Sequence, residues 1–102
     1  MIAASVALMA SFSAVAGLGG LNVQSHLGEP FSGTVTVTGD EAKILLSGGK
    51  ASISDNRLST SVRKSGDNAI VSIRSSGAVR DPVLVFQMGV GAQARQYTAI
   101  ID

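Results

Sequence analysis

Apolar and polar residues alternate along much of the chain between Leu21 and Ile101, and this two-residue period constrains the fold more than any other feature. Successive side chains of a strand point to opposite faces of a sheet, so such alternation is typical of strands that bury one face. Beyond residue 17, no segment keeps the i, i+3, i+4 spacing of an amphipathic helix for more than one turn. The pattern therefore predicts a chain built mainly of short strands.

These strand-like segments are separated by turn residues every 8 to 12 positions or so. The segments are 21–27, 31–38, 43–47, 51–53, 57–63, 69–73, 83–90 and 97–101. The stretch 40–46 is the weakest of the pattern, because its Asp, Glu, Ala, Lys, Ile and Leu could equally form one helical turn. We predict an all-β fold, a small antiparallel β-sandwich of about seven short strands.

Glycine and proline mark the expected turns. Gly48 and Gly49 predict a hairpin between 43–47 and 51–53, because glycine takes a positive φ at little cost. The Ser-Gly-Asp-Asn sequence at 65–68 predicts the turn of a second hairpin. Asp81 precedes a proline, which excludes the α conformation, so a new strand is expected to follow.

The segment 83–90 is apolar at six of its eight positions, with Gln87 and Gly89 as the exceptions. Such a run is typical of a strand covered on both faces, so we expect it at the centre of a sheet. The polar stretch 91–96 is expected to link it to the last strand at 97–101.

Residues 1–16, MIAASVALMASFSAVA, are interpreted as a secretory signal sequence that forms a helix before the domain. The run is apolar and uncharged, and its end at Ala14-Val15-Ala16 fits the small-x-small cleavage rule. It is short for a membrane helix, which needs about 20 residues. Because no Lys or Arg precedes it, we expect the true start to lie upstream. The alternative is a buried helix of the domain itself.

Composition excludes several classes of protein. A chain of 102 residues suffices for one domain, here 17–102. Eight basic and seven acidic residues give a net charge of +1, which disfavours binding to nucleic acid or to anionic membranes. The absence of cysteine rules out disulfides, cysteine zinc sites and thiol catalysis.

Catalytic chemistry has few candidates. His26 is the single histidine, and Glu29 lies three residues later, but two ligands hold a metal poorly. Gly48, Gly49 and Lys50 do not fit a phosphate-binding loop, because Ile44 and Ala51 stand where that motif needs Gly and Ser or Thr. None of the fourteen serines has a motif that supplies a base. We predict no enzyme activity, no cofactor and no metal.

A basic cluster in the middle of the chain could form a patch on one sheet face. Its members are Arg57, Arg63, Lys64, Arg74 and Arg80. The alternative is that they are ordinary solvated residues on strands. The aromatic residues Phe31, Phe86 and Tyr97 occupy apolar-face positions and are expected in the core, so stacking on single-stranded nucleic acid is disfavoured.

Three stretches, taken together, resemble the N-terminal periplasmic domain of the FimV family, and its neisserial members most of all. They are GLGGL at 17–21 with EPF at 29–31, VSIRSS at 71–76 with VRDP at 79–82, and RQYTAIID at 95–102. The resemblance covers nearly all of 17–102. Two departures are a Gly-rich stretch at 89–93 in place of the family's tryptophan-containing turn, and a shortened middle of the domain.

This resemblance implies a non-catalytic protein-interaction domain in the periplasm, linked to type IV pilus assembly, twitching motility, cell-pole and cell-envelope organisation, and adhesion in neisserial members. Implied partners are proteins of the pilus or secretin machinery. The family's peptidoglycan-binding module, inner-membrane helix and cytoplasmic repeats have no counterpart in this sequence, so we expect a fragment or a truncated product. The alternative function is a surface adhesin or carbohydrate-binding β-sandwich, which would need an exposed aromatic platform.

Overall fold

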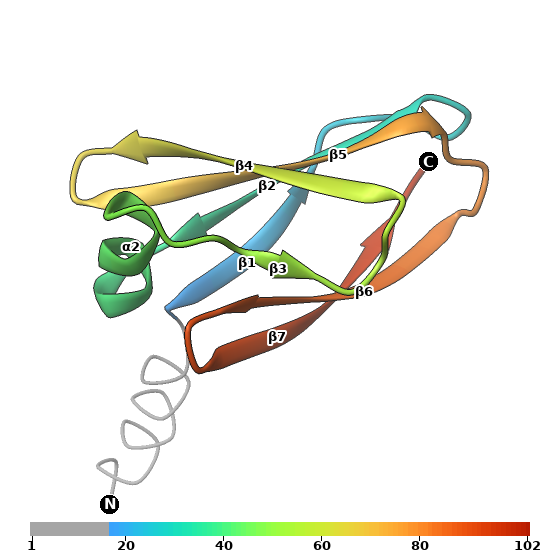
Figure 1. Cartoon of the computed structure of the whole chain (residues 1–102). Helices are drawn as coiled ribbons and strands as arrows, with labels where there is room; N and C mark the ends of the chain where they lie inside the picture. Colours follow the sequence, from blue (N-terminus) through green and yellow to red (C-terminus); the bar gives the residue numbers. More distant parts are fainter. Residues whose placement is uncertain (1–16) are drawn as a thin grey trace, which may run out of the picture.

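Two antiparallel sheets pack face to face in the computed structural model, which describes residues 17–102 (Figure 1). The signal sequence predicted for residues 1–16 lies outside the described residues. The elements are β1 (Leu18–Val23), β2 (Pro30–Val37), α2 (Gly39–Leu46), β3 (Ser52–Ile53), β4 (Leu58–Ser65), β5 (Asn68–Ala78), β6 (Val83–Val90) and β7 (Gln93–Ile100). One sheet has the order β1-β2-β5-β4 and the other β3-β6-β7. The predicted β-sandwich is confirmed.

The core lies between the two sheets and follows the predicted alternation. In β2 and in β5 as far as Ile73, every second residue is buried, and the same holds for β6 and the end of β7. Three aromatic rings join the two layers: Phe31 contacts Phe86 edge-on with centroids 6.3 Å apart, and Phe86 lies 5.7 Å from Tyr97. Burial of a side chain such as Phe86 contributes about 1.5 to 3 kcal/mol. The predicted core position of these rings is confirmed.

Residues 40–46, for which the sequence allowed either a strand or a helix, belong to the helix α2. Its buried residues Ala42 and Leu45 are three positions apart, so a single face packs on the sandwich. Asp40 and Glu41 lie in the first turn and Lys43 in the last, which is the charge arrangement that a helix dipole favours. The apolar segment at 43–47 is therefore not a strand.

The predicted Gly-Gly hairpin is wrong, because Gly48 and Gly49 end the helix instead. The Gly48 N–H donates to the Leu45 carbonyl and the Gly49 N–H to the Ile44 carbonyl, at 3.3 and 2.8 Å. With φ of 103° at Gly48, this is the Schellman arrangement that closes many helices. The following strand β3 pairs with β6, far along the chain, and not with the preceding segment.

The expectation that 83–90 is covered on both faces is also wrong. β6 is the middle strand of its sheet, but only Leu84, Phe86, Met88 and Val90 are buried. The side chains of the opposite face point to solvent, because no element of residues 17–102 packs on that side of the sheet.

Two hairpins have tight two-residue turns. Ser65 pairs with Asn68 across Gly66 and Asp67, which confirms the turn predicted at 65–68. Val90 pairs with Gln93, so most of the predicted linker 91–96 belongs to strand β7. Gly91 has φ of 59° and allows the chain to reverse within two residues.

The first strand also differs from expectation. β1 begins at Leu18 and ends at Val23, whereas Leu27, predicted on the same strand, lies in a turn and is exposed. The edge of the sandwich is closed by β1 and β7, which belong to different sheets. Arg95 of β7 donates from Nη1 to the Leu18 carbonyl at 3.0 Å.

Within the described residues, no helix is long and apolar enough to cross a membrane.

Candidate functional site

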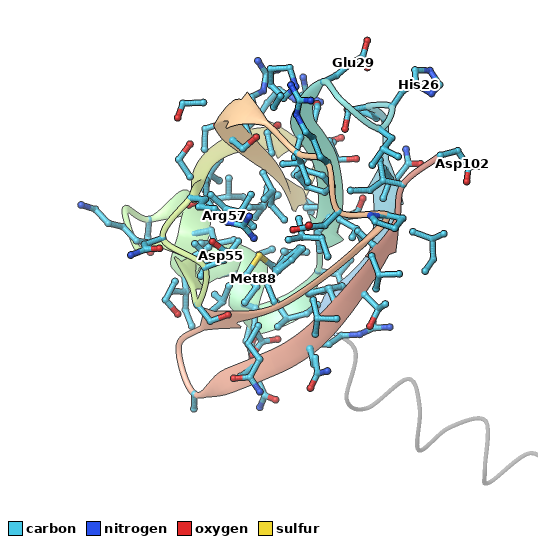
Figure 2. All side chains as sticks on the ribbon, turned by 90° about the vertical axis from the view of Figure 1, so that its right-hand side faces the viewer. His26, Glu29, Asp55, Arg57, Met88 and Asp102 are labelled. Carbon is cyan, nitrogen blue, oxygen red and sulfur yellow. The ribbon has the colours of Figure 1, made fainter. Side chains whose placement is uncertain are left out.

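His26 and Glu29 do not form an acid–base pair. A carboxylate oxygen of Glu29 accepts a hydrogen bond from the backbone N–H of His26 at 2.8 Å, and the Glu29 N–H donates to the His26 carbonyl at 3.1 Å. Both side chains lie at an exposed turn near the C-terminus (Figure 2). Asp81 approaches Arg57, at 3.7 Å. These residues therefore contribute to a turn and a surface ion pair.

Within 17–102, no group of three or more His, Cys, Asp or Glu residues is placed to hold a metal ion. The ion pairs in this part of the chain both involve Arg57, whose Nη2 lies 2.8 Å from Asp55 Oδ2. The side-chain and backbone hydrogen bonds from Arg57 hold the pKa of Asp55 below its usual value. Asp55 also accepts a hydrogen bond from the Leu58 N–H through its carbonyl, so it organises the turn that leads into β4.

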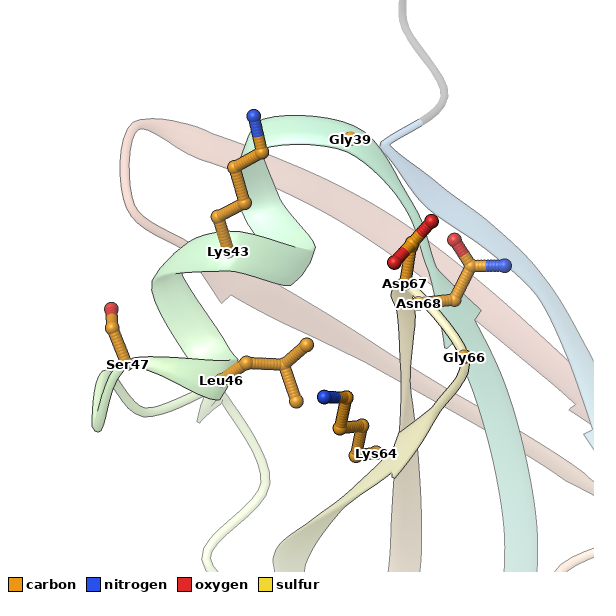
Figure 3. Close-up of a pocket in the computed structure, with 8 residues that line it drawn as sticks. All are labelled: Gly39, Lys43, Leu46, Ser47, Lys64, Gly66, Asp67 and Asn68. Carbon is orange, nitrogen blue, oxygen red and sulfur yellow. The ribbon is translucent and has the colours of Figure 1, made fainter.

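The predicted basic patch is divided between several surfaces. Arg63 and Arg74 share the outer face of the four-stranded sheet, because Arg63 pairs with Ile70, and Ile70 and Arg74 lie an even number of residues apart on β5. Lys64 points to the opposite face, toward the helix α2 (Figure 3). Arg57 lies in a turn outside the sheet. Arg80 lies between β5 and β6, so the five residues do not form a single patch on one sheet face.

The outer face of the four-stranded sheet is polar. Its residues on β2, β4 and β5 alternate with the buried ones and are mostly hydroxylic: Ser32, Thr34, Thr36, Ser59, Ser61 and Ser72. Such polar residues are what a water-exposed sheet face usually carries.

The outer face of the three-stranded sheet carries an apolar strip. Val83 and Val85 of β6 are 49% and 50% exposed, and Ile100 of β7 is 63% exposed. Val83 pairs directly with Ile100, and Val85 lies two residues from Val83 on the same face, so the three side chains are neighbours. We call Val83, Val85 and Ile100 the apolar strip. Three exposed aliphatic side chains side by side contrast with the hydroxylic outer face of the other sheet.

Sequence reasoning missed this strip because the apolar run of β6 looked buried on both sides. A signal was present in the sequence: Gln87 has the same parity as Val83 and Val85, and a polar residue on that side indicates the face that meets water. The exposed positions of β7 agree, since Gln96 pairs with Gln87.

A pocket of about 490 Å³ lies between α2 and the tip of the β4–β5 hairpin (Figure 3). Lys43, Leu46 and Ser47 line it from the helix side, and Lys64, Asp67 and Asn68 line it from the hairpin. Lys43 and Lys64 have no ion-pair partner in residues 17–102. The pocket is thus a recess with a mainly apolar surface, lined by two unpaired cations and by the carboxylate of Asp67.

Strand β4 forms an open edge beside this pocket. It is the last strand in the order β1-β2-β5-β4, and its residues from Ser61 to Ser65 are exposed. The outermost strand of the other sheet, β3, has only two residues. An exposed strand edge presents unpaired N–H and carbonyl groups and can accept a strand from another chain.

Models of protein families, curated proteins and solved structures give no match to this chain. The resemblance to the FimV family therefore stays a prediction from the sequence. The fold, the apolar strip, the pocket and the open edge are the observations on which a function can be proposed.

Proposed function

We propose that this chain is a periplasmic, non-catalytic protein-interaction domain linked to type IV pilus assembly, twitching motility and cell-envelope organisation. The family and the compartment come from the sequence, through the FimV-like stretches in 17–102 and the predicted signal sequence. The β-sandwich is compatible with a domain that binds other proteins and carries out no chemistry itself.

The apolar strip is the observation that carries the proposal. Val83, Val85 and Ile100 expose about half or more of their side chains on one sheet face, while the outer face of the other sheet is hydroxylic. Contiguous exposed apolar surface on a soluble domain often marks a protein interface, because its burial against a partner removes it from water. A pilus or secretin protein that covers this strip would gain that stabilisation.

The alternative function, adhesion or carbohydrate binding, receives less support. A sugar-binding platform needs an exposed aromatic ring, and the aromatic residues of 17–102 are Phe31, Phe86 and Tyr97. All three are buried in the core. We therefore retain protein interaction as the proposed activity.

The experiment is a crosslinking capture from the cell envelope of the producing bacterium, with the tagged protein expressed in a strain that lacks its own copy. The double variant Val83→Ser/Ile100→Ser should recover less than about one tenth of the pilus or secretin components captured by the unaltered protein. The control Ile70→Ser removes an aliphatic side chain from the outer face of the other sheet and should keep capture within about twofold. Recovery of no pilus component by the unaltered protein, with normal pili in the deletion strain, would contradict the proposal.

A further inference from the structure

The backbone of β4 turns a specific set of polar groups outward. A two-residue turn joins β4 to β5, so that Ser65 pairs with Asn68. In a hairpin of this kind, the pair next to the turn is hydrogen-bonded, and so is every second pair along the ladder. The N–H and carbonyl groups of the intervening residues Thr60, Val62 and Lys64 then face away from β5. Within residues 17–102, these groups make no other backbone hydrogen bond.

The same three residues place their side chains on the inner face of the sheet. Leu58, on this face of β4, is buried in the core, whereas Val62 is 37% exposed and Lys64 is exposed at the mouth of the pocket. Leu46 of α2, also partly exposed, lines the pocket opposite Lys64 (Figure 3). The open edge therefore has an apolar surface beside it, and cations on its border.

Strand β4 carries two cations, Arg63 and Lys64, and no acidic residue, while Asp40 and Glu41 lie in the first turn of α2. Lys43, Arg63 and Lys64 lie on the helix and on β4, and the ion pairs of the described chain involve none of them. Asp67, in the hairpin turn, is the acidic residue that lines the pocket. An acidic partner would neutralise these cations, whereas a basic one would be repelled.

We propose that the β4 edge binds an extended segment of another protein in which acidic and apolar residues alternate. The segment adds to the sheet as an antiparallel or parallel strand and hydrogen-bonds to the outward groups of Thr60, Val62 and Lys64. Its apolar side chains cover Val62 and Leu46, and its carboxylates lie near the cations. The proposal rests on the proposed function only in taking the domain as a protein-binding module, and it concerns a surface distinct from the apolar strip.

The test uses the ¹⁵N-labelled chain and two capped octapeptides, one in which Glu and Val alternate and one in which Lys and Val alternate. The Glu-Val peptide should shift the amide signals of Thr60, Val62 and Lys64 and slow their hydrogen exchange. The Lys-Val peptide should bind at least tenfold more weakly, and salt should weaken binding of the Glu-Val peptide. Equal binding of both peptides, no binding at millimolar concentration, or shifts confined to β6 and β7 would overturn the proposal.

Variants separate the edge from general charge effects. The double variant Arg63→Glu/Lys64→Glu should weaken binding of the Glu-Val peptide at least tenfold, and Val62→Pro, which removes one outward N–H, should weaken it similarly. Arg74→Glu changes one cation on the outer face of β5, away from the edge, and should change the affinity less than threefold. Unaltered affinity of Arg63→Glu/Lys64→Glu would overturn the proposal even if Val62→Pro did not fold. The variants of the apolar strip test the proposed function and the β4 variants test the peptide-binding proposal, so one proposal can be contradicted while the other holds.

Discussion

The Tyr97 hydroxyl donates a hydrogen bond to the Gly19 carbonyl at 2.7 Å, across 78 positions of the chain. Tyr97 belongs to β7 and Gly19 to β1, so this bond joins the two sheets at the edge where both strands are outermost. Arg95 lies 5.2 Å from the centre of the Tyr97 ring and bonds the neighbouring Leu18 carbonyl. Residues from the two ends of the described chain thereby close one side of the sandwich.

Tyr97→Phe should lower the free energy of unfolding by about 0.5 to 1.5 kcal/mol, because the ring stays packed while the Gly19 carbonyl loses its donor. Urea denaturation followed by circular dichroism would measure the change. Gln96→Ala, at the adjacent exposed position, is the control and should have a smaller effect. An unchanged midpoint for Tyr97→Phe would show that water replaces the hydroxyl without cost.

Stability should fall at alkaline pH through the same residue. Burial raises the pKa of Tyr97 above 10.0, although the positive charge of Arg95 opposes the shift. The folded state thus keeps the phenol proton where the unfolded state releases it, so the free energy of unfolding decreases as the pH rises above 10.0. Tyr97→Phe should show a shallower decrease over the same range.

The titration itself can be read directly, since the sequence has one tyrosine and no tryptophan. Ultraviolet absorbance of the folded protein should report tyrosinate formation at a higher pH than in the urea-unfolded protein. Coincident titration curves would contradict the raised pKa.

Neighbouring residues of β6 should respond very differently to truncation. Phe86→Ala should cost about 3 to 5 kcal/mol, because the ring is 2% exposed and contacts Phe31 and Tyr97. Val85→Ala should cost about 1 kcal/mol at most, because half of its side chain already meets water. Thermal or urea unfolding measures both, and similar losses for the two variants would argue against the observed orientation of β6.

Gly48→Ala should destabilise the protein by about 1 to 2 kcal/mol, because a Cβ is strained at a φ of 103°. Gly20→Ala is the matched control: that glycine has no positive φ, and an added Cβ meets no atom within 4 Å. The control should be neutral or stabilising by up to about 1 kcal/mol. Equal effects in urea denaturation would mean that Gly48 does not end the helix as described.

Asp55 should contribute to stability at neutral pH and lose this contribution in acid. Its pKa is lowered by hydrogen bonds from Arg57, so the contribution is present above 3.8 and disappears as the pH falls through the lower folded value. The difference in urea midpoint between the unaltered protein and Asp55→Asn should therefore shrink between about pH 6 and about pH 2.5. A difference that stays constant with pH would assign the effect to the turn alone.

The sequence alone predicted the class of fold and much of the core, because the direction of successive side chains is a local property of a strand. The alternation of Val35 and Val37 with threonines, and the Ser-Gly-Asp-Asn turn at 65–68, depend only on neighbours in the chain. The sequence left strand and helix open for residues 40–46, because the adjacent apolar residues at 44–46 show no clear helical spacing. The glycines after it fit a hairpin and a helix end equally well.

The tertiary structure decided which apolar residues are covered and which groups are left open. Val85 and Phe86 are adjacent in an apolar run, yet one meets water and the other the core, because the sheet receives a partner on one face. The contact of Tyr97 with Gly19, the apolar strip and the open edge of β4 all depend on strands distant in the chain. The hydrophobic effect favours burial of apolar residues but does not specify which partner covers them, so these contacts and exposed surfaces depend on how the two sheets pack.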